Sequence, residues 1–176
     1  FFINKNYPNH DIIIFFQGTL EKRIKRTICF FKNVVVHENF FCEYKDFINY
    51  KIKGGGFKLL RWLIPGEYFS KYKYVYIGDV DILILKEKQS LFDFHENQLK
   101  KYNLPFSNKV RLLSNGHLSK RLTGLHFINV KPYYEKIDFV AKKILNDKVY
   151  QSNFLIGLER DEQLLYKIVK TCIGFN

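Results

Sequence analysis

Apolar residues in this chain gather in short runs that polar stretches separate. Residues 11–16 (DIIIFF), 33–37 (NVVVH) and 125–130 (LHFINV) are rich in β-branched and aromatic side chains, which is typical of strands. Residues 20–28 are basic and have helical character. This pattern predicts three short strands, with a helix between the first two.

The longest apolar run, residues 74–85, is interrupted by two carboxylates, Asp79 and Asp81. A run this apolar predicts a strand buried on both faces, and Gly78 would allow the strand to break beside the carboxylates. An unpaired buried carboxylate is costly, so each needs a cation, a basic side chain or several N–H donors as a partner. Two oxygen ligands close to a strand end suit a hard divalent cation that carries a phosphate ester.

Further helices are predicted over residues 57–64, 90–102, about 133–146 and 161–172. The last of these begins with acids and carries bases later, as the helix dipole prefers. Residues 103–121 are polar and irregular, and they predict a long loop. Strands alternating with helices indicate an α/β sandwich with a mainly parallel sheet, in which ligands bind outside the carboxyl ends of the strands.

Size and composition favour one folded domain over residues 1–176. Hydrophobic residues make up 47% and charged residues 26%, as in soluble globular proteins, and no apolar run is as long as a membrane span. The chain has no Met and opens on Phe1-Phe2, so we expect natural sequence before Phe1. Three widely spaced cysteines favour free thiols in a reducing, cytoplasmic compartment.

A net charge of +12 points to anionic partners, namely phosphates, an acidic membrane surface or nucleic acid. The basic residues are spread in small groups, which is also typical of a solvated basic surface. Most aromatic residues lie inside apolar runs and are interpreted as core, so nucleic acid is not the expected partner. A basic nucleic-acid-binding module is kept as an alternative.

An ordered series of residues resembles a known family. Arg61, then Ile64-Pro65, then the apolar run that leads to Asp79-Val80-Asp81 is similar to the nucleotide-sugar glycosyltransferases of the GT-A fold. The resemblance is greatest to glycogenin-like enzymes and to bacterial lipopolysaccharide or capsule hexosyltransferases. Residues 122–129 (LTGLHFIN) and 161–165 (DEQLL) resemble two later segments of the family, and the resemblance extends over about residues 9–170.

This resemblance implies a Rossmann-like GT-A fold, with a mixed, mostly parallel sheet flanked by helices. The implied activity is metal-dependent transfer of a sugar from a nucleotide-diphosphate sugar, a UDP-sugar, to a glycan or lipid-linked acceptor in cell-surface polysaccharide synthesis. The implied cofactor is Mn²⁺ or Mg²⁺, because departure of the nucleoside diphosphate builds negative charge that a cation neutralises. Peripheral contact with the inner membrane face is a hypothesis that the basic charge supports.

The resemblance also implies roles for single residues. Asp81 would bind the metal, while Asp79 would contact the ribose and reach the metal directly or through water. Asp161 and Glu162 are the implied catalytic residues, since they would contact sugar hydroxyls or the reacting carbon. The substrate-binding residues are Arg61, Asp79, Thr123, Gly124 and Gln163. Gln163 stands where the family commonly has Asp, and the family's third metal ligand, a His beyond the final helix, has no obvious counterpart before Asn176. By the resemblance, residues 1–176 are expected to lack the family's first strand, which would lie before Phe1, and its C-terminal end.

Other interpretations remain for the same residues. Asp79 and Asp81 could form a surface turn, Arg61 a structural ion pair, and Asp161 with Glu162 the acidic start of a helix. His126, inside an apolar strand, is interpreted as a hydrogen-bonded core histidine. A haloacid-dehalogenase-like phosphatase also has a strand that ends in Asp-x-Asp. That class has Thr or Val where this chain has Leu83, and a later Gly-Asp-x-x-x-Asp is absent from the sequence.

Overall fold

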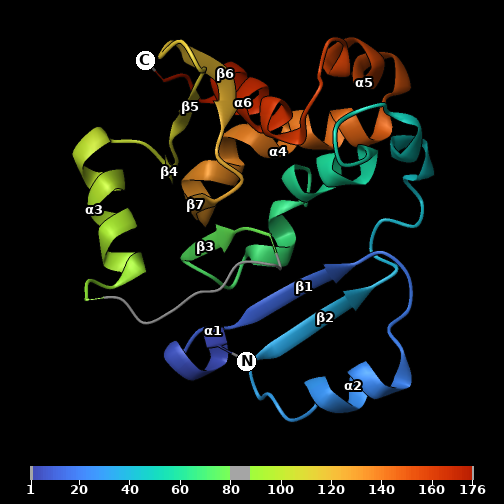
Figure 1. Ribbon diagram of the computed structural model, residues 1–176, viewed down its shortest axis with the longest axis vertical. Helices are drawn as coiled ribbons and strands as arrows, with labels where there is room; N and C mark the ends of the chain where they lie inside the picture. Colours follow the sequence, from blue (N-terminus) through green and yellow to red (C-terminus); the bar gives the residue numbers. More distant parts are fainter. Residues whose placement is uncertain (1, 80–87, 176) are drawn as a thin grey trace. The chain divides into compact units, whose positions relative to one another are not determined.

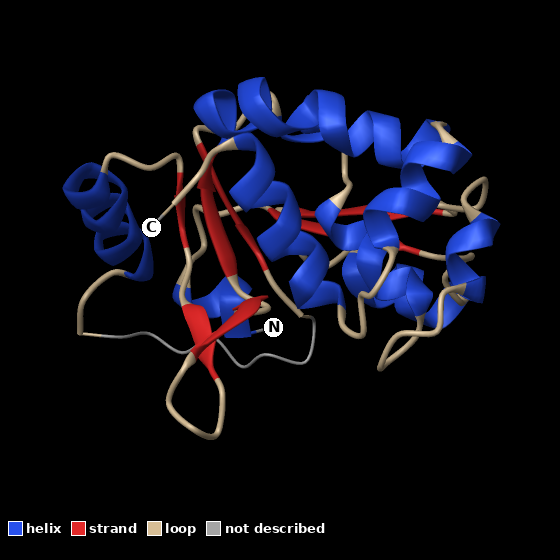
Figure 2. Cartoon of the chain, turned by 90° about the horizontal axis from the view of Figure 1, so that it is seen from above, coloured by secondary structure: helices blue, strands red, loops and turns tan. Residues whose placement is uncertain are grey.

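The computed structural model describes residues 2–79 and 88–175, which form a mixed α/β structure with small sheets (Figure 1; Figure 2). The described residues belong to two compact units. Unit 1 comprises residues 2–45 and 88–91, and unit 2 comprises residues 46–79 and 92–175. A single catalytic domain over residues 1–176 stays a prediction.

Unit 1 is built on two parallel strands, β1 (Ile12–Phe16) and β2 (Val34–Glu38). Parallel neighbours need a crossover connection, and the short helix α2 (Lys22–Ile28) supplies it. Glu38 at the end of β2 accepts a hydrogen bond from the Leu20 N–H at 2.5 Å and from Nζ of Lys25 at 2.7 Å. The first helix, α1 (Phe2–Asn6), precedes β1. The two strands predicted in this part of the sequence are confirmed.

Unit 2 is built around an antiparallel sheet in the order β3–β7–β4. The strands are β3 (Tyr74–Ile77), β7 (His126–Asn129) and β4 (Phe106–Ser107). Tyr74 lies opposite Asn129 and Ile77 opposite His126 in the register of β3 and β7. The central strand β7 is the most buried, because Phe127 and Ile128 are fully inaccessible to solvent.

Helices complete the core of unit 2. They are α3 (Leu91–Tyr102), α4 (Val130–Asn146), α5 (Lys148–Leu155) and α6 (Asp161–Cys172), with 3₁₀ helices η1 (Lys45–Asn49), η2 (Gly56–Trp62) and η3 (Gly66–Phe69). Helix α6 contacts both α4 and η2. The apolar face of α6 is fully buried, since Leu164, Leu165 and Ile168 are at most 1% exposed. This packing holds η2 next to the start of α6.

Residues 103–121, predicted as a long loop, contain a hairpin instead. Strands β5 (Val110–Leu112) and β6 (Leu118–Leu122) pair in antiparallel fashion around an Asn115-Gly116 turn. Gly116 has a φ of 81°, and the Leu113 N–H donates to the His117 carbonyl at 2.7 Å. The loop prediction is wrong. In β6 only Ser119 and Leu122 are buried, so the sequence of this strand lacks the alternation of apolar and polar residues by which a strand is predicted.

Other predicted helices differ from the structure in type or bounds. The helix predicted over residues 57–64 is present as a 3₁₀ helix, Gly56–Trp62. Helix α4 begins at Val130 and includes Pro132 in its first turn, where a helix has no need of the missing N–H. Helix α5 was not predicted, because its periodicity is weak. The helix predicted over residues 161–172 is confirmed at both ends.

The predicted parallel sheet and the strand of residues 74–85 also need correction. Among the described strands only β1 and β2 are parallel, and the other pairs are antiparallel. Strand β3 is half-buried rather than buried on both faces, and it ends at Ile77, next to Gly78. Residues 80–85 of the predicted strand, including Asp81, lie outside the described residues.

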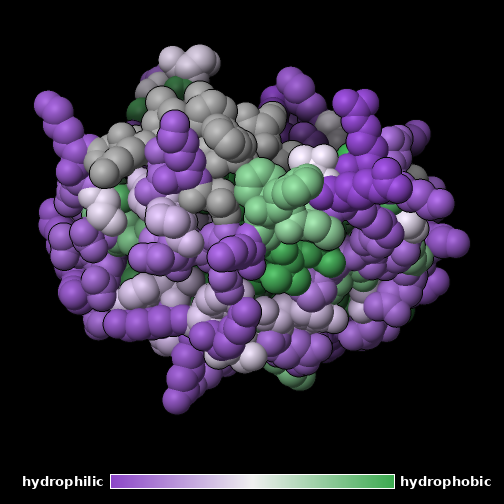
Figure 3. Space-filling view, turned by 90° about the horizontal axis from the view of Figure 1, so that it is seen from below, coloured by the Kyte–Doolittle hydropathy of each residue, from purple (hydrophilic) through white to green (hydrophobic). Residues whose placement is uncertain are grey.

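The surface has the polar character expected from the composition. Hydrophilic residues cover most of the described surface on the face drawn in Figure 3. Within residues 2–79 and 88–175, no helix combines the length and the apolar character needed to cross a bilayer.

Candidate functional site

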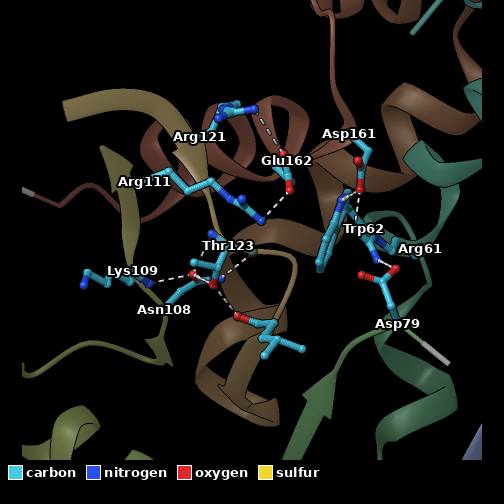
Figure 4. Close-up of polar contacts among 11 residues, drawn as sticks. Arg61, Trp62, Asp79, Asn108, Lys109, Arg111, Arg121, Thr123, Asp161 and Glu162 are labelled. Carbon is cyan, nitrogen blue, oxygen red and sulfur yellow. Dashed lines mark hydrogen bonds and ion pairs between the residues drawn. The ribbon is translucent and has the colours of Figure 1, made fainter. Parts of the chain in front are cut away.

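Arg61 lies between two carboxylates that come from distant parts of unit 2. Its Nη1 donates to Oδ1 of Asp79, and its Nη2 donates to Oδ2 of Asp161 at 2.5 Å (Figure 4). Asp79 is 18 residues from Arg61 in sequence, and Asp161 is 100 residues away. One guanidinium therefore joins η2, the segment after β3 and the start of α6.

Local structure explains why the two carboxylates differ. Asp161 is the first residue of α6, where the helix dipole stabilises negative charge, and its side chain is only 8% exposed. Asp79 follows the end of β3, and its side chain is 46% exposed. Asp161 is thus the buried anchor of Arg61, and Asp79 is the carboxylate on the solvent side.

Trp62 completes the buried side of this arrangement. Its indole Nε1 donates to Oδ2 of Asp161 at 3.0 Å, so this oxygen accepts from both Trp62 and Arg61. The guanidinium carbon of Arg61 lies 4.3 Å from the centre of the Trp62 ring, in a cation–π contact. Nε of Arg61 is buried and has no acceptor among the described residues.

Gly124 lies against the two charged groups. A Cβ built on Gly124 would stand 3.3 Å from Nη2 of Arg61 and 3.3 Å from Oδ2 of Asp79. The absence of a side chain therefore leaves room for both groups. We name Arg61, Trp62, Asp79, Gly124 and Asp161 the Arg61 cluster.

Thr123, next to Gly124, is held by Asn108 rather than pointing into the cluster. The Asn108 side-chain oxygen accepts from the Thr123 N–H at 3.0 Å and from its hydroxyl at 2.6 Å. The Asn108 Nδ2 donates to the Thr123 carbonyl at 3.2 Å and lies 2.9 Å from Nδ1 of His126. Asn108 thereby fixes the backbone that presents Gly124.

His126 anchors this network from the core, as the sequence predicted. It is fully buried, and desolvation lowers its pKa to about 3, so the imidazole is neutral at physiological pH. Because Nδ1 accepts from Asn108, Nε2 carries the hydrogen and donates to the Tyr133 hydroxyl at 3.0 Å. Burial also raises the pKa of Tyr133, which stays protonated.

Glu162 belongs to a second group of charges beside the Arg61 cluster. Its carboxylate lies 2.8 Å from Nη2 of Arg111 and 3.7 Å from Nη1 of Arg121, both on the β5–β6 hairpin. Figure 4 shows that Asp161 faces Arg61, while the adjacent Glu162 faces the hairpin. The two predicted catalytic residues therefore have different partners.

Gln163 and Asp81 complete the predicted set. The side-chain oxygen of Gln163 accepts from the Arg160 N–H at 2.9 Å and from the Glu159 N–H at 2.7 Å. This amide caps the start of α6 and is not part of the Arg61 cluster. Asp81 lies outside the described residues. The metal site predicted for Asp79 and Asp81 is therefore described only at Asp79.

The charges of the Arg61 cluster do not balance. Arg61 contributes one positive charge, and Asp79 and Asp161 contribute two negative charges, so the cluster carries a net charge of about −1 when both are ionised. The adjacent group of Glu162, Arg111 and Arg121 carries the opposite excess of about +1, so charge alone does not call for a further cation. The more exposed Asp79 carboxylate is still a hard oxygen donor of the kind that Mg²⁺ and Mn²⁺ accept. Within residues 2–79 and 88–175, no three or more His, Cys, Asp or Glu side chains gather as a metal site.

Several residues of the site were missed from the sequence. Asn108, Arg111 and Arg121 lie in the stretch that was predicted as a loop, so nothing connected them with Thr123 or Glu162. Trp62 carried a usable signal, because it is the single Trp of the chain and directly follows Arg61. No family model, curated protein or solved structure matches the chain.

Loss of the Arg61 guanidinium should strongly destabilise the fold. We expect Arg61→Met to lower the free energy of unfolding by about 3 kcal/mol, because Asp161 would stay buried without its cation. Denaturant unfolding measures the change, and Lys148→Met, which removes the exposed ion pair with Asp46, should leave the free energy of unfolding almost unchanged. The double variant Arg61→Met/Asp161→Asn should lower the free energy of unfolding by less than the sum of the two single variants. Additive losses would refute the coupling between Arg61 and Asp161.

Burial of His126 should make stability depend on pH. In the unfolded chain His126 becomes protonated below about pH 6.5, whereas in the folded chain it stays neutral down to about pH 3. The free energy of unfolding therefore falls as the pH drops through this window. We expect the free energy of unfolding of the wild type to fall relative to that of His126→Gln by about 1.4 kcal/mol per pH unit. Burial lowers the pKa of His95 too. His95 is present in both proteins, so its contribution cancels in the difference between their free energies of unfolding. Parallel pH curves for the two proteins would contradict this assignment.

Proposed function

We propose that this chain is a metal-dependent glycosyltransferase that uses a nucleotide-diphosphate sugar. The observation that carries the proposal is the Arg61 cluster. The sequence resemblance assigns Arg61, Asp79, Gly124 and Asp161 to one donor pocket, and the fold brings these four residues together from separate segments. This convergence supports the proposal, because the resemblance placed these residues in one pocket although Arg61 and Asp161 are 100 residues apart.

The charge of the cluster suits a diphosphate held by a cation. Asp79, with Asp81 as its second carboxylate, would hold Mn²⁺ or Mg²⁺, and the cation would neutralise the charge that builds on the leaving diphosphate. The Arg61 guanidinium would face the diphosphate or the donor sugar, where its planar set of donors suits paired oxygens. Its buried Nε, which has no acceptor among the described residues, could be satisfied by a ligand oxygen after a small side-chain shift.

The other predicted residues take supporting roles. Asp161 would position Arg61 rather than contact the sugar, because its Oδ2 already accepts from Arg61 and Trp62. Glu162, held by Arg111 and Arg121, is the better candidate for contact with sugar hydroxyls or the reacting carbon. Gly124 would let a ligand approach the backbone closely, and Asn108 with Thr123 would fix that backbone.

The proposal extends to the fold and to the acceptor. We propose that the mixed α/β structure is a GT-A arrangement, with the parallel pair β1–β2 as part of its nucleotide-binding half. The acceptor class that we propose is a glycan or a lipid-linked saccharide. The sugar and the base are to be identified by the following screen.

Metal-linked nucleotide binding tests the proposal directly. We expect UDP with Mn²⁺ to stabilise the chain by about 2.7 kcal/mol at a UDP concentration one hundred times its Kd, which thermal unfolding would register as an increase in Tm of several degrees. Asp81→Asn should remove most of this increase, because a metal ligand is lost. Asp46→Asn, at a carboxylate that pairs with Lys148 outside the Arg61 cluster, is the matched control and should keep the increase.

Other nucleotide diphosphates and their sugars belong in the same screen. Stabilisation by one of them that requires Mn²⁺ or Mg²⁺ and is lost in Asp81→Asn would support the proposal for that donor. Absence of stabilisation by every nucleotide, or equal stabilisation of the wild type and Asp81→Asn, would refute it.

A further inference from the structure

The β5–β6 hairpin carries an exposed apolar tip. Leu112 and Leu118 lie directly opposite each other across the strand pair and are 57% and 71% exposed, and the adjacent Leu113 is 47% exposed. The Gly116 turn and the hydrogen bond between Leu113 and His117 hold these side chains at the end of the hairpin. Three leucines gathered at one exposed tip are unusual, whereas single exposed apolar residues are common.

Basic residues flank this tip, without any acid on the hairpin. Lys109 and Arg111 precede it and Lys120 and Arg121 follow it, and the sequence has no Asp or Glu from Asn97 to Tyr134. Arg111 and Arg121 are partly balanced by Glu162, so the exposed Lys109 and Lys120 contribute most of the excess charge. The hairpin therefore combines an apolar end with a positively charged stem.

A basic hollow adjoins the stem. It has a volume of about 380 Å³ and is lined by Lys120 of β6, by Lys167 and Lys170 of α6, and by the Ile156-Gly157 connection between α5 and α6. Nζ of Lys167 is fixed by a hydrogen bond of 2.6 Å to the Phe154 carbonyl, and Ile156 is 71% exposed at its rim. Lys120 belongs both to the stem and to this hollow, so the two features form one continuous surface.

We propose that this surface docks onto an anionic lipid bilayer. The leucines of the tip would enter the boundary between headgroups and acyl chains, and the lysines of the stem and hollow would face lipid phosphates. Burial of apolar side chains combined with attraction of Lys and Arg to anionic lipids is the usual basis of peripheral membrane binding. The hairpin lies at the edge of unit 2, beside α6, which leaves its turn accessible (Figure 1; Figure 2).

The structure favours a bilayer over two other occupants. A second copy of this chain would bring two positive surfaces together in a protein of net charge +12. A single-stranded nucleic acid would be expected to stack on aromatic side chains, and the hairpin from Val110 to Leu122 has no Phe, Tyr or Trp. Leucines at the tip contribute apolar area to a lipid interface but offer no planar ring to a base.

The hairpin is also rigid enough to insert without a large ordering cost. Ser119 and Leu122 on β6 are buried, β6 packs along α6, and the two arginines bind Glu162. These contacts fix the stem, and the turn contacts fix the tip, so little conformational freedom is lost on docking. The leucines and lysines proposed to contact lipid lie outside the Arg61 cluster and do not touch Glu162 through any ion pair of the described residues, so membrane docking can be tested separately from the proposed glycosyltransferase activity.

Co-sedimentation with vesicles tests the proposal. We expect the full chain to bind phosphatidylcholine vesicles that contain phosphatidylglycerol, to bind pure phosphatidylcholine much less, and to lose binding as NaCl is raised. Replacing all three tip leucines, in Leu112→Ser/Leu113→Ser/Leu118→Ser, should weaken partitioning roughly tenfold or more. The single variants Leu118→Ser and Val149→Ser are matched, since both residues are more than 70% exposed, and only Leu118→Ser should weaken binding.

Tryptophan emission then locates the contact. The single native Trp62 is buried, so we expect the added indole of Leu118→Trp, but not that of Val149→Trp, to shift its emission to shorter wavelength on anionic vesicles. Equal shifts for the two variants, or vesicle binding unchanged in the triple serine variant, would overturn the proposal. Oligonucleotide binding that competes with vesicles and persists in the triple serine variant would instead identify a nucleic-acid surface. Mn²⁺-linked nucleotide stabilisation should be unchanged in the triple serine variant, which separates this test from that of the proposed function.

Discussion

One partly buried guanidinium shared between two carboxylates is the constraint on which the candidate site depends. Arg61 cannot lose its charge, so the surrounding fold has to supply anions and an aromatic face. Asp161 and Trp62 do so from the buried side, and Asp79 does so from the solvent side. The start of α6, the end of η2 and the segment after β3 are thereby fixed relative to one another within unit 2.

The rest of the site follows from this arrangement. Gly124 leaves room for Arg61 and Asp79, since a Cβ there would stand 3.3 Å from each of them, and Asn108 and His126 hold the segment before β7 on which Gly124 lies. Glu162 follows Asp161 on α6 and is directed to the hairpin by two arginines. The start of α6 therefore links the Arg61 cluster to the hairpin for which membrane docking is proposed.

The sequence predicted much of the fold and part of the site. Strong local patterns, such as the apolar runs of β1 and β7 and the acidic start of α6, marked their elements, whereas the hairpin was missed because its strands expose most of their side chains. Asp79, one of the carboxylates that interrupt the apolar run, has Arg61 as a partner, but it is 46% exposed rather than buried as the apolar run predicted. Strand direction and the contacts of Asn108, Arg111 and Gln163 depend on packing between distant segments, which no local pattern encodes.

The anomalous signal of manganese in crystals grown with Mn²⁺ and UDP is the most direct test of the account. The account predicts a manganese peak beside Asp79 and Asp81, with the diphosphate of UDP within hydrogen-bonding distance of Arg61. A manganese peak remote from Asp79, or UDP bound away from the Arg61 cluster, would contradict it.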